Sequence, residues 1–263
     1  MPQQQGFSLA TVVLSYFLVG GGMFTAMLIA GFAKVTSDVI VYVMMAAGAF
    51  LGGFVAGRAS RGATILEPAI GGIAVIGTIV GLAAGTEVGK FLWNVDSGGT
   101  MKFVGLVGGL AAGGALAGAW ISEKALGEST QSSGPWVIYS MLATFGACVL
   151  ATVIATFIVV GSASPETNAD SVATGLIIGL ASGCIIAGIS IGVSARTRPL
   201  LSSFLGGVLG TGGFALLVTR AGGERGGSQD EMAILGVFAL GGGIATLIGC
   251  AIGWAAIGKK RQG

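Results

Sequence analysis

The sequence predicts an all-α integral membrane protein with eight transmembrane helices, arranged as two tandem parallel four-helix repeats. Of the 263 residues, 53% are hydrophobic and 9% are charged, whereas a soluble domain carries about 25% charged residues. The charges gather between long apolar runs, and about eight of these runs reach the roughly 20 residues that span a bilayer as a helix. A third observation is a hairpin from Gly48 to Gly77 that recurs later in the chain, from Gly183 to Gly212.

The two copies of this hairpin match without gaps. In each copy a short basic turn joins two apolar segments, and glycines and one arginine recur at the same positions. We interpret the chain as a first repeat over residues 1–127 and a second over 128–263, with a polar Ser/Gly-rich linker at about 122–135. Because four is an even number of spans, both repeats should have the same orientation. The fourth and eighth spans match at an offset of 134, whereas the first and fifth match only in being apolar.

The elements follow from the apolar runs in order. The first run is too long for the core of a signal peptide and has no basic region before it, so we expect a retained span. Residues 86–102 carry four large apolar side chains at helical spacing, which predicts a helix on the membrane surface. The predicted spans are residues 7–32, 39–57, 63–85, 103–121, 136–160, 172–193, 200–219 and 232–257.

Glycine is the most informative residue type. The chain has 50 glycines without a Gly-X-Y period, and glycine within an apolar helix lets two backbones approach closely. Many recur every fourth residue, as in a glycine zipper, which places them along one helix face. These faces either pack within the bundle or dock identical subunits or a partner membrane protein, and the sequence does not separate the two uses. The predicted helix-packing glycines are Gly48, Gly53, Gly57, Gly77, Gly81, Gly105, Gly109, Gly113, Gly175, Gly179, Gly183, Gly188 and Gly192.

The basic residues predict the orientation. The side that holds both termini and the loops near residues 60, 128 and 197 carries eight Lys or Arg, and the other side carries five. By the positive-inside rule both termini are then cytoplasmic. The short loops and Gly/Ala-rich spans favour a bacterial inner membrane. Trp120, Trp136 and Trp254 fall near the predicted cytoplasmic interface, where an amphipathic indole is favoured.

Glu67 is the charged residue of most interest, because it lies inside the third predicted span next to Pro68. A carboxylate in the bilayer is costly and usually faces the bundle interior or water. One interpretation is a proton or cation site. The other is a helix-end residue, favoured by the helix dipole and able to pair with Arg58 or Arg61. Ser202 and Ser203 occupy the matching place in the second half, which argues against a symmetric ion site.

Four arginines lie in the basic turns of the two hairpins. They could contact the anionic headgroups of lipids, or they could serve only to set the topology. The four residues are Arg58, Arg61, Arg196 and Arg198.

Composition excludes most catalytic chemistry. The chain has no histidine, and its three cysteines lie inside apolar runs, so we expect no metal site and no cofactor. Catalytic triads that use histidine cannot form, and no aspartate lies inside a predicted span. Nothing in the sequence indicates nucleic-acid binding.

We therefore expect a non-catalytic polytopic membrane protein, a structural or accessory subunit of a membrane complex. Its partners would be the lipid bilayer and either other membrane subunits or further copies of itself. The alternative is a small permease or channel for a neutral or lipid-like solute. The duplication favours this alternative, while the scarcity of buried charge argues against ion coupling.

Overall fold

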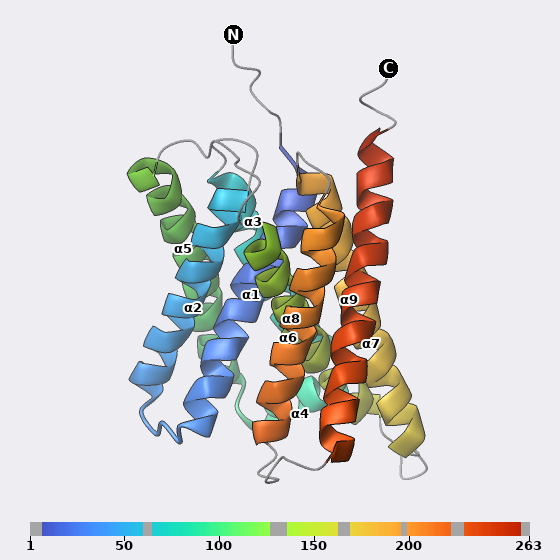
Figure 1. Ribbon diagram of the computed structural model, residues 1–263. Coiled ribbons are helices and arrows are strands. Elements are labelled where there is room, and N and C mark those ends of the chain that lie inside the picture. The colour runs from blue at the N-terminus through green and yellow to red at the C-terminus, as the bar shows by residue number, and fades with distance from the viewer. Residues whose placement is uncertain are drawn as a thin grey trace.

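The computed structural model describes residues 7–59, 65–126, 136–162, 169–195, 199–221 and 229–258. Over these residues the protein is all-helical, with nine helices and no strand (Figure 1). Eight of the described helices are long and apolar enough to cross a membrane. This confirms the prediction of an all-α chain with eight helices of membrane-spanning length.

The helix bounds follow the predicted spans closely. Both ends of every predicted span lie within three residues of the observed helix, except for the fourth span. The helices are α1 Leu9–Phe32, α2 Asp38–Ala59, α3 Leu66–Gly85, α4 Glu87–Val95, α5 Ser97–Leu126, α6 Trp136–Ser162, α7 Ala169–Ser194, α8 Leu200–Ala221 and α9 Gln229–Gly258.

The fourth span starts six residues earlier than predicted, because Asp96 caps α5. Its Oδ1 accepts a hydrogen bond from the backbone N–H of Gly99 at 2.8 Å, and its carbonyl accepts one from Thr100 at 2.9 Å. An aspartate before the first turn satisfies backbone donors that the helix leaves unpaired. This local capping extends the helix through a Gly-Gly-Thr stretch that apolar character alone does not include.

The predicted helix within residues 86–102 is α4. It is capped by Thr86, whose hydroxyl accepts a hydrogen bond from the backbone N–H of Gly89 at 3.1 Å. Lys90 and Glu87 form an exposed ion pair at 2.7 Å. The helix lies at the end of the bundle opposite the start of α1 (Figure 1) and contacts α3, α5 and α6.

The long helices form two groups of four that lie side by side (Figure 1). In one group α2 lies against α1 and α5, and α3 lies against α1 and α5; in the other α7 lies against α6 and α9, and α8 lies against α6 and α9. Helix α1 also contacts α6 and α7, so it joins the groups. Half of its apolar window is buried, compared with 22–39% for the other seven candidate spans.

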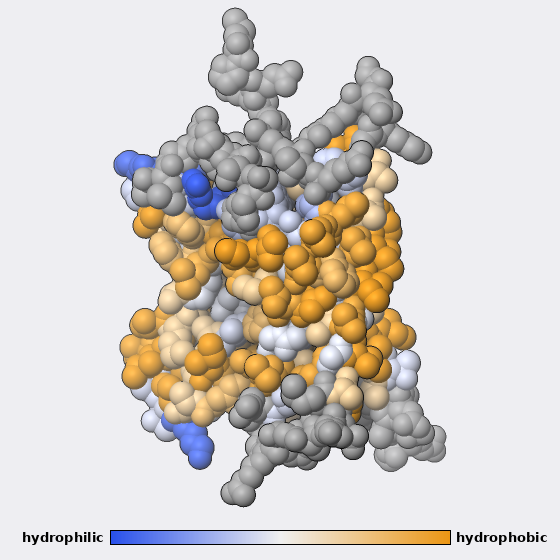
Figure 2. All heavy atoms as spheres, in the orientation of Figure 1, coloured by the Kyte–Doolittle hydropathy of each residue, from blue (hydrophilic) through white to orange (hydrophobic). Residues whose placement is uncertain are grey.

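The outer surface is apolar. Figure 2 shows mostly apolar side chains over the face in view, between hydrophilic residues near its upper and lower ends. Large side chains such as Val237 and Ile73 are 71% and 55% exposed. A soluble protein rarely exposes apolar patches of this extent, so the surface agrees with a multi-pass membrane protein.

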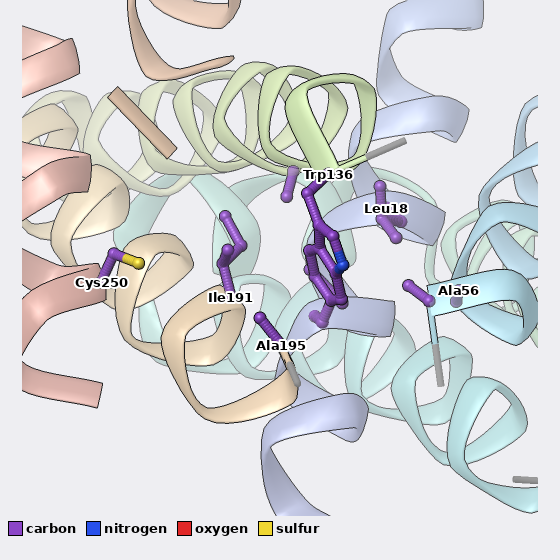
Figure 3. Packing of buried hydrophobic residues seen from close by; sticks show 9 residues of the cluster. Leu18, Ala56, Trp136, Ile191, Ala195 and Cys250 are labelled. Atoms are coloured by element: carbon purple, nitrogen blue, oxygen red, sulfur yellow. The ribbon is translucent and has the colours of Figure 1, made fainter. Parts of the chain in front are cut away.

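Trp136 differs from its predicted environment. The sequence places it at the lipid interface, but its side chain is only 3% exposed and packs where the two groups meet. Figure 3 shows the indole between Leu18 and Ala56 on one side and Ile191 and Ala195 on the other. Trp136 therefore belongs to the core between the groups, because α1, α2 and α7 surround the first turn of α6.

Candidate functional site

Glu67 lies in the first turn of α3 and is buried, with 2% of its surface exposed. Its Oε1 accepts a hydrogen bond from the backbone N–H of Ser8 at 2.6 Å. Ser8 is the N-cap of α1, and its own hydroxyl accepts from the backbone N–H of Thr11. The carboxylate thus lies at the N-terminal ends of two helices, whose dipoles both favour a negative charge. This geometry supports the helix-end interpretation, and a proton or cation role stays a prediction.

Arg58 lies in the last turn of α2 and is half-buried. Its guanidinium interacts electrostatically with the Tyr139 side chain on α6, so it connects the two groups of helices at the end where α1 starts (Figure 1). The other three arginines predicted to contact anionic lipid, Arg61, Arg196 and Arg198, lie outside the described residues. Lipid contact by this set stays a prediction.

Seven of the predicted packing glycines lie against a neighbouring helix. A Cβ built on Gly48 would overlap the backbone of Gly22 on α1, and one on Gly53 would overlap Ala115 on α5. At these two positions any other residue would push two helix backbones apart. Gly175 lies on α7. The seven are Gly48, Gly53, Gly57, Gly179, Gly183, Gly188 and Gly192.

Five other predicted packing glycines face away from the bundle. A Cβ built on Gly77 or Gly81 of α3 would meet no described atom within 4 Å, and the same holds for Gly105, Gly109 and Gly113 of α5. Packing inside the described part of the chain therefore does not account for these positions. Docking of another chain, the other use that the sequence leaves open, stays a prediction for them.

Contacts between helices recur in the two groups and relate the fourth and eighth spans at two offsets. Gly118 on α5 lies against the carbonyl of Phe50 on α2, and Gly249 on α9 lies against the carbonyl of Ile185 on α7. Phe50 and Ile185 match at the offset of 135 that relates Gly48 to Gly183, but Gly118 and Gly249 match at an offset of 131. The contacts of α2 with α5 and of α7 with α9 thus relate the fourth and eighth spans at 131. The contacts of Gly108 with Ile76 and of Gly242 with Thr211, which are matching residues of α3 and α8, keep the expected offset of 134.

Matching glycine contacts in the two groups also align α1 with α6, two helices whose sequences match only in being apolar. Gly71 on α3 approaches the Ser15 Cβ on α1, and Gly206 on α8 approaches the Ser140 Cβ on α6. The two glycines keep the hairpin offset of 135, whereas the two serines match at an offset of 125. Because the two offsets differ, a comparison without gaps at the hairpin offset could not find this pair.

The outward face of α5 differs from the matching face of α9. At the offset of 131, the open positions Gly109 and Gly113 match Leu240 and Ile244. These two side chains are 54% and 51% exposed. Two of the three open positions of α5 thus match large apolar residues in α9, whereas Gly105 matches Gly236, which is open as well. At the positions of Gly109 and Gly113, an outward place does not by itself require a small residue.

A set of buried hydroxyls lies inside the second group. Ser203 on α8 donates to the Thr246 carbonyl on α9 at 3.2 Å, and Ser140 on α6 donates to the Ser203 carbonyl at 3.2 Å. Thr144, one turn after Ser140, is fully buried and its hydroxyl has no hydrogen-bond partner among the described residues. At the offset of 125, Val19 stands at the place of Thr144. The sequence reasoning missed this cluster, because isolated Ser and Thr within apolar spans carry no pattern.

Two further findings bear on the chemistry of the site. In the part of the chain that the structure describes there is no group of three or more His, Cys, Asp or Glu side chains that could hold a metal ion. A comparison of the chain with family models, with curated proteins and with solved structures gives no match.

Proposed function

We propose that the protein is a non-catalytic structural or accessory subunit of a membrane complex, built from two tandem four-helix repeats. The duplication is supported by the recurring contacts of α2 with α5 and of α7 with α9, and of α1 with α3 and of α6 with α8. Glycine packing supports it too, because Gly53 and Gly188 each approach a carbonyl at matching places, on Ala115 and Thr246.

The observation that carries the proposal is the open glycine face of α5, Gly105, Gly109 and Gly113. A glycine inside a helix is about 0.5–1 kcal/mol less favourable than alanine, and no packing within the described chain offsets that cost here. On α9 the positions that match Gly109 and Gly113 carry the exposed Leu240 and Ile244, and the position that matches Gly105 carries Gly236, which is also open. A small-residue face in lipid favours close approach of another helix through dispersion contacts. We therefore assign α5, together with Gly77 and Gly81 of α3, as the face that a partner subunit or a second copy covers.

The experiment is native mass spectrometry of the full chain, extracted gently from its own host. We expect a stoichiometric second polypeptide or a second copy of the chain. Replacement of Gly109 and Gly113 by leucine should remove that partner while the chain stays folded, because these positions have room for a side chain. Exchanging Leu240 and Ile244 for isoleucine and leucine on the matching face of α9 should leave the assembly intact. A lone wild-type chain, or a glycine variant that keeps its partner, would contradict the proposal.

A permease for a neutral solute is the second candidate, and the hydroxyl cluster of the second group favours it. A buried hydroxyl without a partner costs about 1–3 kcal/mol, so the unpaired Thr144 hydroxyl needs a reason. In a permease it would contact water or a neutral polar solute. Glycerol-induced swelling of proteoliposomes tests this: Thr144→Val, which keeps the shape of the side chain, should then abolish permeation. Swelling equal to that of protein-free vesicles would exclude glycerol transport.

We also propose that both termini face the cytoplasm, in a bacterial inner membrane. The start of α1 and the end of α9 lie at the same end of the bundle (Figure 1), as an even number of spans requires. The excess of basic residues on that side supports its cytoplasmic assignment.

A further inference from the structure

Cys148 on α6 and Cys184 on α7 bring their thiols together inside the second group of helices. The two sulfur atoms are 3.7 Å apart, and the two residues are 1% and 2% exposed. Both thiols are free. A disulfide has an S–S distance of about 2.05 Å, so the two sulfur atoms are direct neighbours without a bond between them.

The backbones of α6 and α7 are close at this level because of a glycine. A Cβ built on Gly183, the residue before Cys184, would lie 3.2 Å from the carbonyl oxygen of Ala147, the residue before Cys148. The two cysteines therefore follow directly on a close approach of their helices. This proximity belongs to the helix packing and does not depend on the side-chain rotamers alone.

The thiol pair lines a pocket of about 320 Å³ between α6, α7, α8 and α9. The rim of this pocket includes Ile177 and Val237, which are 56% and 71% exposed on the outer, apolar surface. Thr211 is the one hydroxyl in the described lining, and it already donates to the carbonyls of Gly207 and Ala239. The pocket thus presents two thiols to an apolar molecule that arrives from the lipid side.

We propose that Cys148 and Cys184 form an oxidisable dithiol whose oxidant is an organic hydroperoxide dissolved in the bilayer, such as a peroxidised acyl chain. This inference is independent of the proposed function. A hydroperoxide suits the pocket because its apolar body matches the lining, and because thiols reduce peroxides without a further cofactor.

The chemistry balances in two steps. The sulfur of one cysteine attacks the outer oxygen of the hydroperoxide, and the O–O bond breaks. The thiol proton passes to the leaving alkoxide oxygen, so the products are a cysteine sulfenic acid and the lipid alcohol. The second thiol then attacks the sulfenic sulfur, an S–S bond forms, and water leaves with the thiol proton. Two electrons pass from the two thiols to the peroxide, and the disulfide ties α6 to α7. The sulfenic acid and the disulfide are both uncharged, which suits an apolar surrounding.

Cys250 is the internal control. It is also fully buried, but it lies in the cluster around Trp136 and Ile191 and does not line the pocket. If burial alone decided which thiols are oxidised, the three cysteines would react alike. We instead expect Cys148 and Cys184 to be oxidised and Cys250 to stay reduced.

The test uses the full chain in lipid nanodiscs, treated with cumene hydroperoxide, then denatured, alkylated with N-ethylmaleimide and mapped by mass spectrometry. We expect wild-type protein to lose two of its three alkylatable thiols and to yield one peptide pair linked through Cys148 and Cys184. Cys250→Ser should give the same link, and Cys148→Ser and Cys184→Ser should give none. Hydrogen peroxide at equal concentration should act at least tenfold more slowly, since it partitions into water.

Three outcomes would overturn the proposal. Full alkylation of all three cysteines after treatment would show that the pair does not react. A link that includes Cys250, or links between chains, would show that proximity within the pocket does not direct the reaction. Equal rates of disulfide formation with hydrogen peroxide and cumene hydroperoxide would show that the oxidant does not reach the thiols from the bilayer. The wild-type map depends on no substitution, so a variant that fails to fold does not affect these results.

Discussion

Gly21 on α1 and Gly146 on α6 lie face to face where the two groups of helices cross. A Cβ on Gly21 would overlap the Cα of Gly146, and a Cβ on Gly146 would overlap the carbonyl oxygen of Phe17. Both atoms in the way belong to backbone, so no side-chain rotation relieves the contact. The crossing of α1 and α6, and with it the placement of one group against the other, therefore depends on the absence of a side chain at both positions.

Gly21→Val should destabilise the protein more than a substitution on an open face. Overpacking of a well-packed core typically costs about 1–3 kcal/mol, and we expect at least the upper end here because the backbones themselves must separate. Thermal unfolding in detergent, followed by tryptophan fluorescence, measures the loss. Gly109→Val is the matched control, since its position is open. Equal losses for the two variants would show that the crossing does not limit stability.

Trp136→Ala should lower stability by about 3–5 kcal/mol, the range for truncating a buried large aromatic residue. The indole fills the space between the groups and makes an edge-to-face contact with Tyr139 at 5.6 Å. Trp120 gives the comparison, because it is 47% exposed and its ring lies 4.6 Å from the Lys124 ammonium. Trp120→Ala should cost only about 0.5–1 kcal/mol, the worth of an exposed cation–π contact. The idea fails if the two variants unfold at the same temperature.

Glu67→Ala should be more damaging than Glu67→Gln. Glutamine keeps an acceptor for the Ser8 backbone N–H and loses only the charge at the two helix ends, worth about 0.3–1 kcal/mol. Alanine leaves a backbone donor without this partner, which costs about 1–3 kcal/mol when buried. Thermal unfolding of both variants, with Ser202→Ala at the matching place of α8 as control, gives the order. A glutamine variant of unchanged stability that loses solute flux would instead assign Glu67 to a transport step.

The orientation is tested by labelling single cysteines in intact cells. Ser97 starts α5 at the end of the bundle opposite the start of α1 and the end of α9 (Figure 1), and Lys124 lies in the last turn of the same helix; both are exposed. In a background without the three native cysteines, Ser97→Cys should react with a membrane-impermeant maleimide from outside. Lys124→Cys should react only after lysis. The reverse pattern would place the termini outside the cell.

The register of the helices could not be predicted from the sequence alone. Gly108 and Gly242 match at an offset of 134 and contact the matching residues Ile76 and Thr211, whereas the contacts of Gly118 and Gly249 match at 131. A shift of three positions keeps nearly the same helix face, because a turn has about 3.6 residues. Glycine-rich helices therefore offer several alignments of similar quality, and the contacts of the structure use two of them.

The sequence by itself determined the class and the helices, since runs of about 20 apolar residues between charged loops have one stable solution in a bilayer. Tertiary structure alone decided which faces are inside. In water the apolar face of a helix turns inward, but in lipid both faces are apolar, so the period of hydrophobicity does not separate core from surface. That is why Trp136 lies in the core, why Gly109 lies open while Gly53 is packed, and why Cys148 meets Cys184 and not Cys250.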